Sequence, residues 1–281
     1  MLVHAKEILL LAKAGGYAVL APDFFDLDSA RCYVQAAEAA GKPVILSFAQ
    51  VHCQMGVMTL EEAALIGKFL AGNASVPVVL HLDHGQDEEF VRRAIDLGFT
   101  SVMLDASMED FETNAARTRA VVEYAHARGV SVEAEIGHVG TGENYTSYAD
   151  TDSVYTTVEE AVAFVERTGV DSLAVSIGTA HGIYKNQAKP VLNFQRLHQL
   201  AQAVPVPLVL HGGSGSGDDN LRRCAREGIS KINVLTDFFV GAMKQIADTQ
   251  PRDYLSLKRA ANAGMVKAAE HCFRMFDERN I

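Results

Sequence analysis

The sequence is poor in cysteine and has no apolar run long enough to cross a bilayer. Its four cysteines are scattered and form no Cys-x-x-Cys pair. This spacing is typical of proteins from the reducing cytoplasm and argues against a disulfide framework. The stretch MLVHAKEILLLAKAGG contains apolar residues but no small-residue cleavage site, so we expect an amphipathic helix there and not a signal peptide.

Positive charge is also scarce. Lysine and arginine number 25 against 35 acidic residues, which leaves a formal net charge of −10. A nucleic-acid groove needs clustered basic side chains, so this balance argues against a nucleic-acid partner. It does not exclude a local anion site, because backbone N–H groups can build one without net charge. The 281 residues, 48% of them hydrophobic, are sufficient for one large domain with a sizeable core.

Strand-like and helix-like segments alternate along the chain. We predict strands at 17–21, 43–48, 76–82, 101–104, 130–136, 172–177, 207–211 and 229–234. The predicted helices that follow them are 27–40, 60–71, 88–97, 111–128, 158–167, 194–203, 219–227 and 238–247, with a last helix near 255–276. Such alternation implies a parallel sheet, and eight units predict an α/β protein with a closed (β/α)8 TIM barrel. We expect a single domain over residues 1–281, with a C-terminal helical extension over about 250–281.

Metal-binding side chains follow several predicted strands at their carboxyl ends, which converge on one face of such a barrel. The run VVLHLDHG at 78–85 carries Asp83 and His84 near its end, and His181 and His211 lie at the carboxyl ends of later strands. Each of them alone is more often a helix cap or a satisfied polar group. Together, the three imidazoles predict a metal site, because they suit zinc and leave a fourth position for substrate or water.

Carboxylates also lie near the carboxyl ends of the fourth and fifth predicted strands. Asp105 lies in MLDAS, and Glu133 and Glu135 lie in VEAEIG. Side chains alternate along a strand, so Glu133 and Glu135 point to the same side, and direction alone does not choose between them. The glycine-rich loop that follows favours Glu135, which is nearer the open end, as a further ligand or as a partner of one.

A second group of residues predicts an anion site. The run GGSG at 212–215 follows the seventh strand, and Asn233 and Thr236 lie at the carboxyl end of the eighth. Glycines let backbone N–H groups approach a ligand, and the amino end of a helix favours negative charge. The alternative is a flexible turn. Beside His211, and at a place where this barrel commonly binds phosphate, we favour a phosphate site.

These motifs together resemble the class II, metal-dependent ketose-bisphosphate aldolases, the family of fructose- and tagatose-bisphosphate aldolases. The likeness covers nearly the whole chain through AGGYAV, HLDHG, SVMLDAS, VEAEIG, GVDSLAVSIGTAHGIYK, VLHGGSG and KINVLTD. It implies reversible cleavage of a ketose (bis)phosphate to dihydroxyacetone phosphate and an aldehyde, with zinc, or cobalt or iron in its place, stabilising the enediolate. It further implies a cytoplasmic homodimer or homotetramer of carbohydrate metabolism such as glycolysis, with a sugar phosphate substrate and no membrane partner.

The resemblance also implies catalytic and metal-binding roles. Asp83 is then the acid/base on the C4 hydroxyl, and Glu143 removes the proton of the donor. Glu135 and Asp105 match positions linked to metal movement or to a second metal position. The residues that match the zinc ligands are His84, His181 and His211.

The same resemblance implies residues for the two phosphates. Lys185 adds charge near the donor phosphate or a monovalent-cation site, and Arg259 matches an arginine that reaches the distal phosphate across subunits. The positions that match the donor phosphate site are Gly182, Gly212, Gly213, Ser214, Asn233, Val234, Leu235 and Thr236.

The chain departs from the family pattern where the distal phosphate binds. Members usually carry an asparagine-rich segment after the first strand and a serine after the second, and here Asp23 and Ala49 stand at those places. An aspartate repels a dianion, and alanine offers no side-chain donor. We therefore expect a standard donor half and an altered aldehyde half lined by Asp23, Gln50 and His52. The expected aldehyde lacks a phosphate, as in a non-standard ketose 1-phosphate, or carries another polar or anionic end.

Two other functions fit part of the pattern. A zinc-dependent hydrolase or isomerase on the same barrel would need no donor-phosphate loop, so GGSG together with INVLT argues against it. A non-catalytic sugar-phosphate-binding metalloprotein should have lost its acid/base residue, whereas Asp83 and Glu143 are both present.

Overall fold

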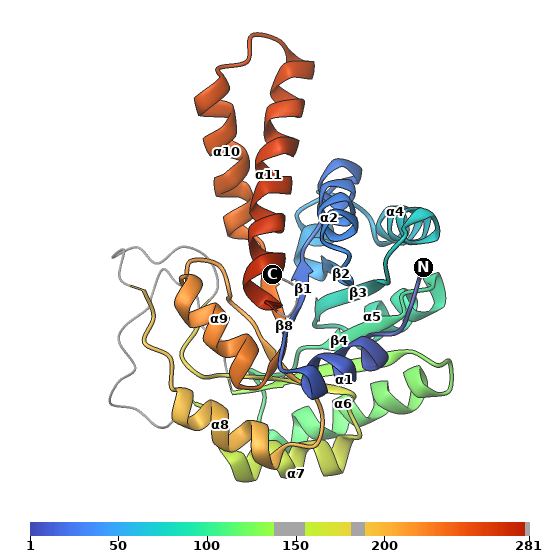
Figure 1. Cartoon of the computed structure of the whole chain (residues 1–281). Coiled ribbons are helices and arrows are strands. Elements are labelled where there is room, and N and C mark those ends of the chain that lie inside the picture. The colour runs from blue at the N-terminus through green and yellow to red at the C-terminus, as the bar shows by residue number, and fades with distance from the viewer. Residues whose placement is uncertain (138–154, 181–188, 279–281) are drawn as a thin grey trace.

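The computed structural model describes residues 1–137, 155–180 and 189–278. Within these residues, parallel strands pair in chain order and β1 pairs with β8, which closes the barrel (Figure 1). The prediction of a closed (β/α)8 barrel is confirmed. The strands are β1 (Val19–Pro22), β2 (Val44–Ala49), β3 (Val78–Gly85), β4 (Ser101–Leu104), β5 (Ser131–Ile136), β6 (Ser172–Val175), β7 (Leu208–Leu210) and β8 (Ile229–Val234).

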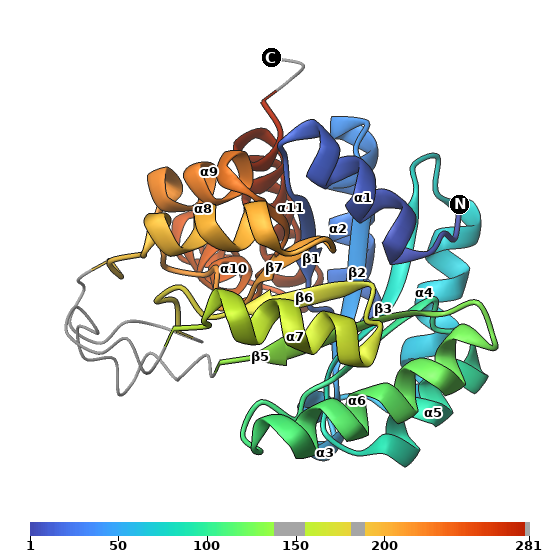
Figure 2. The same cartoon turned by 90° about the horizontal axis from the view of Figure 1, so that it is seen from below.

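Helices surround the barrel, as the view in Figure 2 shows. They are α1 (Ala5–Gly15), α2 (Leu27–Ala40), α3 (Gln50–Gln54), α4 (Leu60–Asn73), α5 (Glu88–Leu97), α6 (Phe111–His126), α7 (Val158–Thr168), α8 (Phe194–Ala203), α9 (Asp218–Glu227), α10 (Thr236–Thr249) and α11 (Tyr254–Phe276). The amphipathic first helix is confirmed. The short helix α3 was not predicted, because five residues are too few for a helical period to be recognised. Within the described residues, no helix combines the length and the apolar character of a membrane span.

Local sequence explains where the helices begin. Asp26 and Ser29 form a capping box at the start of α2, and Thr59 and Glu62 form another at the start of α4. Each box satisfies backbone N–H groups that the first helical turn leaves without partners. These caps place the helix starts one residue after a polar side chain, where the sequence predicted them.

Strand alternation divides the core into two clusters. Leu20, Leu46 and Leu80 face outward and pack under the surrounding helices. Their neighbours in the strands face inward and pack against Ile8 and Leu9 of α1. Because α1 fills this end of the barrel interior with apolar side chains, polar chemistry is left to the carboxyl ends of the strands.

Helices α10 and α11 form an antiparallel arm that extends beyond the barrel (Figure 1). Gly241 of α10 and Gly264 of α11 meet where the two helices cross. A Cβ atom on Gly264 would collide with the backbone of Gly241 and would lie 2.8 Å from the Cα atom of Ala242. The absence of side chains therefore allows the two helices to approach this closely.

Substituting Gly264 with alanine should lower the free energy of unfolding by about 1–3 kcal/mol, because overpacking forces the two helices apart. Urea unfolding followed by circular dichroism measures the change. Gly72→Ala in α4 is the matched control, since nothing lies within 4 Å of a Cβ atom there. Its alanine should be neutral or stabilising by up to about 1 kcal/mol. Equal stability of the two variants would contradict the close approach of the arm helices.

Candidate active site

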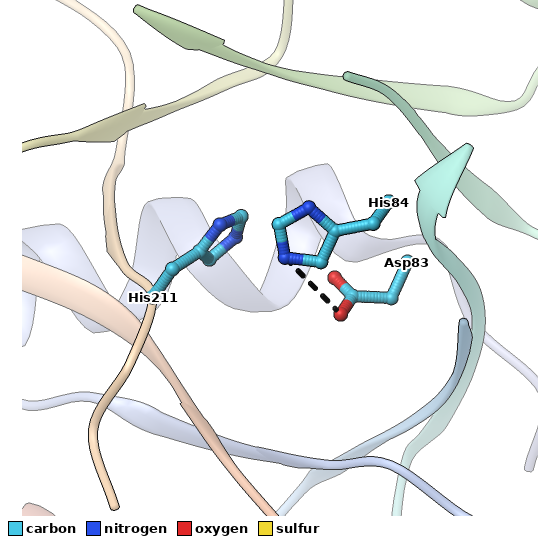
Figure 3. Close-up of side chains that lie close together, drawn as sticks. All are labelled: Asp83, His84 and His211. Atoms are coloured by element: carbon cyan, nitrogen blue, oxygen red, sulfur yellow. Dashed lines mark ion pairs between the residues drawn. The ribbon is translucent and has the colours of Figure 1, made fainter. Parts of the chain in front are cut away.

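Strand β3 carries Asp83 and His84 to the open end of the barrel. The pairing of β3 with β4 shifts register between Leu82 and Gly85, and His84 has a left-handed backbone with φ of 45°. A bulge re-aims side chains, and left-handed backbone at a non-glycine residue is concentrated at functional sites. Here the bulge breaks the strict alternation of the strand, so that consecutive side chains both point toward His211 (Figure 3).

Asp83, His84 and His211 bring donor atoms within 4.8 Å of one another, which suits a metal ion. His84 Nε2 lies 3.8 Å from Asp83 Oδ2, and the rings of the two histidines are 4.6 Å apart between centroids. Asp83 and His211 are buried, and His84 is partly exposed. The structure thus brings together two of the three predicted imidazole ligands. The third, His181, lies outside the described residues.

Asp105 holds the other side of the His84 ring. Its Oδ2 lies 2.8 Å from His84 Nδ1, and its Oδ1 accepts hydrogen bonds from the backbone N–H and hydroxyl of Ser107. Burial opposes ionisation of Asp105, but the hydrogen bond and charge of His84 and the Ser107 donors hold its pKa below the usual range. The resulting carboxylate orients His84 so that Nε2 faces Asp83.

His211 is fully buried between two carboxylates. Its Nδ1 lies 2.8 Å from Glu135 Oε2, and its Nε2 lies 3.0 Å from Glu133 Oε1. Burial favours the neutral ring, but these two hydrogen bonds outweigh it and raise the pKa of His211 to about 10. Both glutamates on the inward side of β5 therefore act on His211, although the sequence pattern favoured Glu135 alone.

Lys231 is a buried cation that the sequence analysis missed. Its Nζ lies 2.8 and 2.9 Å from the two carboxylate oxygens of Glu133 and 3.2 Å from His81 Nε2. A lysine next to isoleucine within a short predicted strand was the available signal, because a charge in a buried strand requires a partner. The sequence could not show which partner it has.

Asn233 fixes the carboxylate of Asp83 by donating a hydrogen bond of 2.9 Å from Nδ2 to Oδ1. Burial opposes ionisation of Asp83. The charge of His84, a hydrogen bond from His81 and the charge of Lys231 nevertheless hold its pKa well below the usual range. Asp83 is therefore ionised near neutral pH and ready to accept a proton.

A cavity of about 260 Å³ opens beside Asp83 and His84. The sequence-predicted donor-phosphate residues that line it are Gly212, Gly213, Ser214, Asn233, Val234, Leu235 and Thr236. Gly213 must lack a side chain, since a Cβ atom would lie 2.6 Å from the carbonyl oxygen of Asn233. Helix α10 begins at Thr236, so its amino end adjoins this cavity and favours an anion there.

Of the residues predicted for the aldehyde half, Asp23 lies at this cavity, and Gln50 and His52 do not. Asp23 lines the cavity, and burial together with the charge of Asp83 raises its pKa to about 8. Gln50 uses its Oε1 to accept the backbone N–H of Gln86 at 2.8 Å, which anchors the loop after β3. The imidazole of His52 lies beside Phe48, with 6.1 Å between ring centroids. Neither Gln50 nor His52 lines this cavity, and their predicted role stays a prediction.

The remaining predicted site residues lie elsewhere. Arg259 is exposed on α11 in the arm. Glu143, Gly182 and Lys185 lie outside the described residues, so the structure does not place them.

The chain is similar in sequence and in structure to known aldolases. The family model described as fructose-bisphosphate aldolase class-II matches residues 3–280. The fructose-bisphosphate aldolase of Thermus caldophilus is 38% identical over 302 residues, covering 97% of this chain and 98% of that protein. That of Staphylococcus aureus is 38% identical over 276 residues, covering 95% of each. The crystal structure of the YdjI aldolase from Escherichia coli K12 superposes with a TM-score of 0.88 at 34% identity, covering 100% of this chain and 99% of that one. The chain therefore belongs to the class II fructose-bisphosphate aldolase family and is an aldolase, a carbon–carbon lyase.

Proposed function

We propose that the protein reversibly cleaves a ketose (bis)phosphate to dihydroxyacetone phosphate and an aldehyde. The observation that carries the proposal is the cluster of Asp83, His84 and His211 at the edge of a cavity lined by the 212–214 loop. A retro-aldol assay of the zinc-loaded protein tests it. The panel is fructose bisphosphate, tagatose bisphosphate and several ketose 1-phosphates, and release of dihydroxyacetone phosphate is the expected result.

His84 and His211 fit a divalent metal, and His181 is the proposed third ligand. Imidazole nitrogens suit zinc, and cobalt and iron are the alternatives that the same donors accept. The orienting carboxylates of Asp105 and Glu135 are typical partners of ligand histidines. When bound, the metal supplies Lewis-acid stabilisation of the negative charge that develops on the ketose oxygens as the carbon–carbon bond breaks.

The side chains of the protein supply the proton transfers. Asp83, ionised and fixed by Asn233, takes the C4 hydroxyl proton during cleavage and returns it during condensation. Glu143 is the proposed base on the donor carbon in the reverse direction. Backbone N–H groups of the 212–214 loop and the amino end of α10 hold the donor phosphate, to which Lys185 adds charge. A fixed phosphate keeps the reacting carbon in position.

The aldehyde half is proposed to take an acceptor without a phosphate, so that the substrate is a ketose 1-phosphate. Among the described residues that line the cavity there is no lysine or arginine, whereas Asp23 and Asp83 both contribute carboxyl groups. Asp23 Oδ1 is buried and has no hydrogen-bond partner within the described residues. A hydroxyl group of an uncharged acceptor would satisfy this atom by donating a hydrogen bond to it.

The pH dependence of substrate preference should report on Asp23. As the pH rises through about 8, the Asp23 carboxyl loses its proton and repels an anionic acceptor. The ratio of kcat/KM for fructose bisphosphate to that for the best ketose 1-phosphate should therefore fall by about tenfold between pH 7 and pH 9, which corresponds to about 1.4 kcal/mol. In Asp23→Asn the ratio should stay level. A parallel fall in wild type and variant would exclude Asp23 as the cause.

We also propose that the arm joins copies of this chain into a homodimer or homotetramer, which would bring Arg259 toward a neighbouring site. Exposed apolar side chains gather on the arm, and a patch of this kind marks an interaction surface. These side chains are Phe239, Val240, Met243, Tyr254, Leu255 and Leu257.

Leu255→Glu should shift the protein toward monomer, because a carboxylate on this apolar face would have to be buried in the interface. Size-exclusion chromatography with light scattering measures the mass at several protein concentrations. Leu65→Glu on α4 is the matched control, since Leu65 is 66% exposed and Leu255 is 65% exposed. If both substitutions dissociate the oligomer, or if neither does, the proposal that the arm forms the interface is contradicted.

The proposed location is the cytoplasm. All four cysteines, Cys32, Cys53, Cys224 and Cys272, are free thiols, and all but Cys53 are buried. Free buried thiols suit a reducing compartment.

A further inference from the structure

The connection between β3 and α5 consists of Gln86 and Asp87, and it comes directly after the residues that carry the proposed chemistry. His84 has a left-handed backbone, with φ of 45°. Such a conformation is unfavourable for a residue with a side chain, and it persists only where the surrounding structure holds it. The chain just after His84 must therefore be held in place by other parts of the molecule.

Two helices hold the backbone of Gln86 from its two polar groups. Gln50 of α3 uses its Oε1 to accept the backbone N–H of Gln86 at 2.8 Å and that of Asp87 at 3.4 Å. Arg117 of α6 donates from Nη2 to the carbonyl oxygen of Gln86 at 3.0 Å. Because only an oxygen can accept the two N–H groups, they also determine which end of the Gln50 amide faces the connection.

The residue between His84 and Gln86 is fixed as well. The carbonyl oxygen of Gly85 accepts the backbone N–H of Asp105 at 2.7 Å. A Cβ atom on Gly85 would lie 2.6 Å from the carbonyl oxygen of Met103, so this residue packs directly against β4. The backbone after His84 is thus held by β4, α3 and α6 together.

We infer that Gln50 and Arg117 are positioning residues, which maintain the left-handed turn at His84 and so keep Asp83 and His84 in place at the proposed metal site. The inference rests on the proposed function, in which these two side chains act on the substrate and the metal. Neither Gln50 nor Arg117 is among the described residues that line the cavity. A residue that contacts the aldehyde discriminates between substrates, whereas a positioning residue affects every substrate alike.

The first test compares Gln50→Met with Gln50→Glu in the retro-aldol assay. Methionine has the length of glutamine but no oxygen, whereas glutamate keeps an acceptor for the N–H of Gln86. In Gln50→Met we expect kcat to fall by about 10²-fold for every active member of the panel, since a small misplacement of reacting groups has this effect. KM should stay near wild type, because the donor-phosphate loop is unchanged. Gln50→Glu should recover most of kcat.

Cobalt(II) supplies a measurement that does not depend on activity. Its visible absorption spectrum reports how the donor atoms are arranged around the ion. Loaded with cobalt(II), Gln50→Met should give an altered spectrum and Gln50→Glu the wild-type spectrum. Gln54→Met on the same helix is the control, because Gln54 is exposed. A merely structural role of Gln50 would lower the melting temperature and leave kcat and the spectrum unchanged.

Arg117→Met tests the other contact with Gln86. We expect kcat to fall by about tenfold, again for every substrate, and less than in Gln50→Met because water can replace a guanidinium that is 26% exposed. Arg119→Met is the matched control on the same helix. Arg119 pairs with Glu123 at 3.1 Å and is 66% exposed, so its loss should leave kcat at the wild-type value.

The outcomes separate the inference from the proposed function. Wild-type kcat in Gln50→Met would overturn the inference and leave the proposed function intact. A fall confined to some members of the panel would place Gln50 against the aldehyde and would also overturn it. A wild-type chain that releases no dihydroxyacetone phosphate from any member would overturn both. If Gln50→Met does not fold, Arg117→Met decides, and wild-type kcat in that variant would overturn the inference.

Discussion

Replacing Asp83 by asparagine should lower kcat for retro-aldol cleavage by about 10²–10⁴-fold, the usual contribution of a general acid–base group. Asparagine preserves the shape of the side chain but cannot accept the C4 hydroxyl proton. The wild-type carboxylate is ionised because the charges of His84 and Lys231 and the hydrogen bond from His81 outweigh its burial. Release of dihydroxyacetone phosphate from the best substrate of the panel, at saturating concentration, measures the effect.

Asp87→Asn is the matched control for that experiment. Asp87 lies four residues further along the chain and caps α5 by accepting the backbone N–H groups of Glu89 and Phe90. Asparagine caps a helix about as well as aspartate, so both stability and kcat should stay near wild type. Zinc affinity of the Asp83 variant should be measured in parallel. An Asp83→Asn enzyme that keeps more than a tenth of the wild-type kcat with zinc bound would exclude Asp83 as the acid/base.

Removing the divalent metal with a chelator should reduce kcat/KM by about 10³-fold or more. Lewis-acid stabilisation of the developing charge contributes several kcal/mol, and each 1.36 kcal/mol corresponds to a factor of ten. Adding back one equivalent of zinc, cobalt or iron should restore activity, and the extent of recovery with each ion identifies the preferred metal. Metal content by mass spectrometry before and after treatment accompanies the assay.

Two histidine variants show whether recovery depends on the proposed site. His84→Ala should not recover after addition of metal, because His84 is a proposed ligand beside Asp83 and His211. His126→Ala should recover fully, since His126 contacts Asp171 on the far side of the barrel. Full activity of the chelated wild-type protein, verified to be free of metal, would contradict a metal-dependent mechanism.

The order of strands and helices could be predicted from the sequence because strand and helix periods are local. The same holds for which residues lie near the carboxyl ends of the strands. Once a parallel barrel is predicted, residues at the carboxyl ends of its strands must meet at one face. The sequence therefore predicts that Asp83, His84 and His211 lie close together. The 212–215 loop was recognisable because glycine is needed wherever the backbone approaches another chain segment or a ligand closely.

Only the tertiary structure decided which groups contact one another. The bulge at His84 depends on the register between β3 and β4, and register is not a property of one strand. The contact of Lys231 with Glu133 joins residues 98 positions apart, and the sequence shows only that a buried lysine needs some partner. The sequence placed Gln50 near the aldehyde pocket, and only the structure shows that its Oε1 accepts the backbone N–H of Gln86 in the loop after β3. Periodicity along the chain determines the elements and their faces, whereas hydrogen bonds inside the barrel depend on distances between strands that only folding sets.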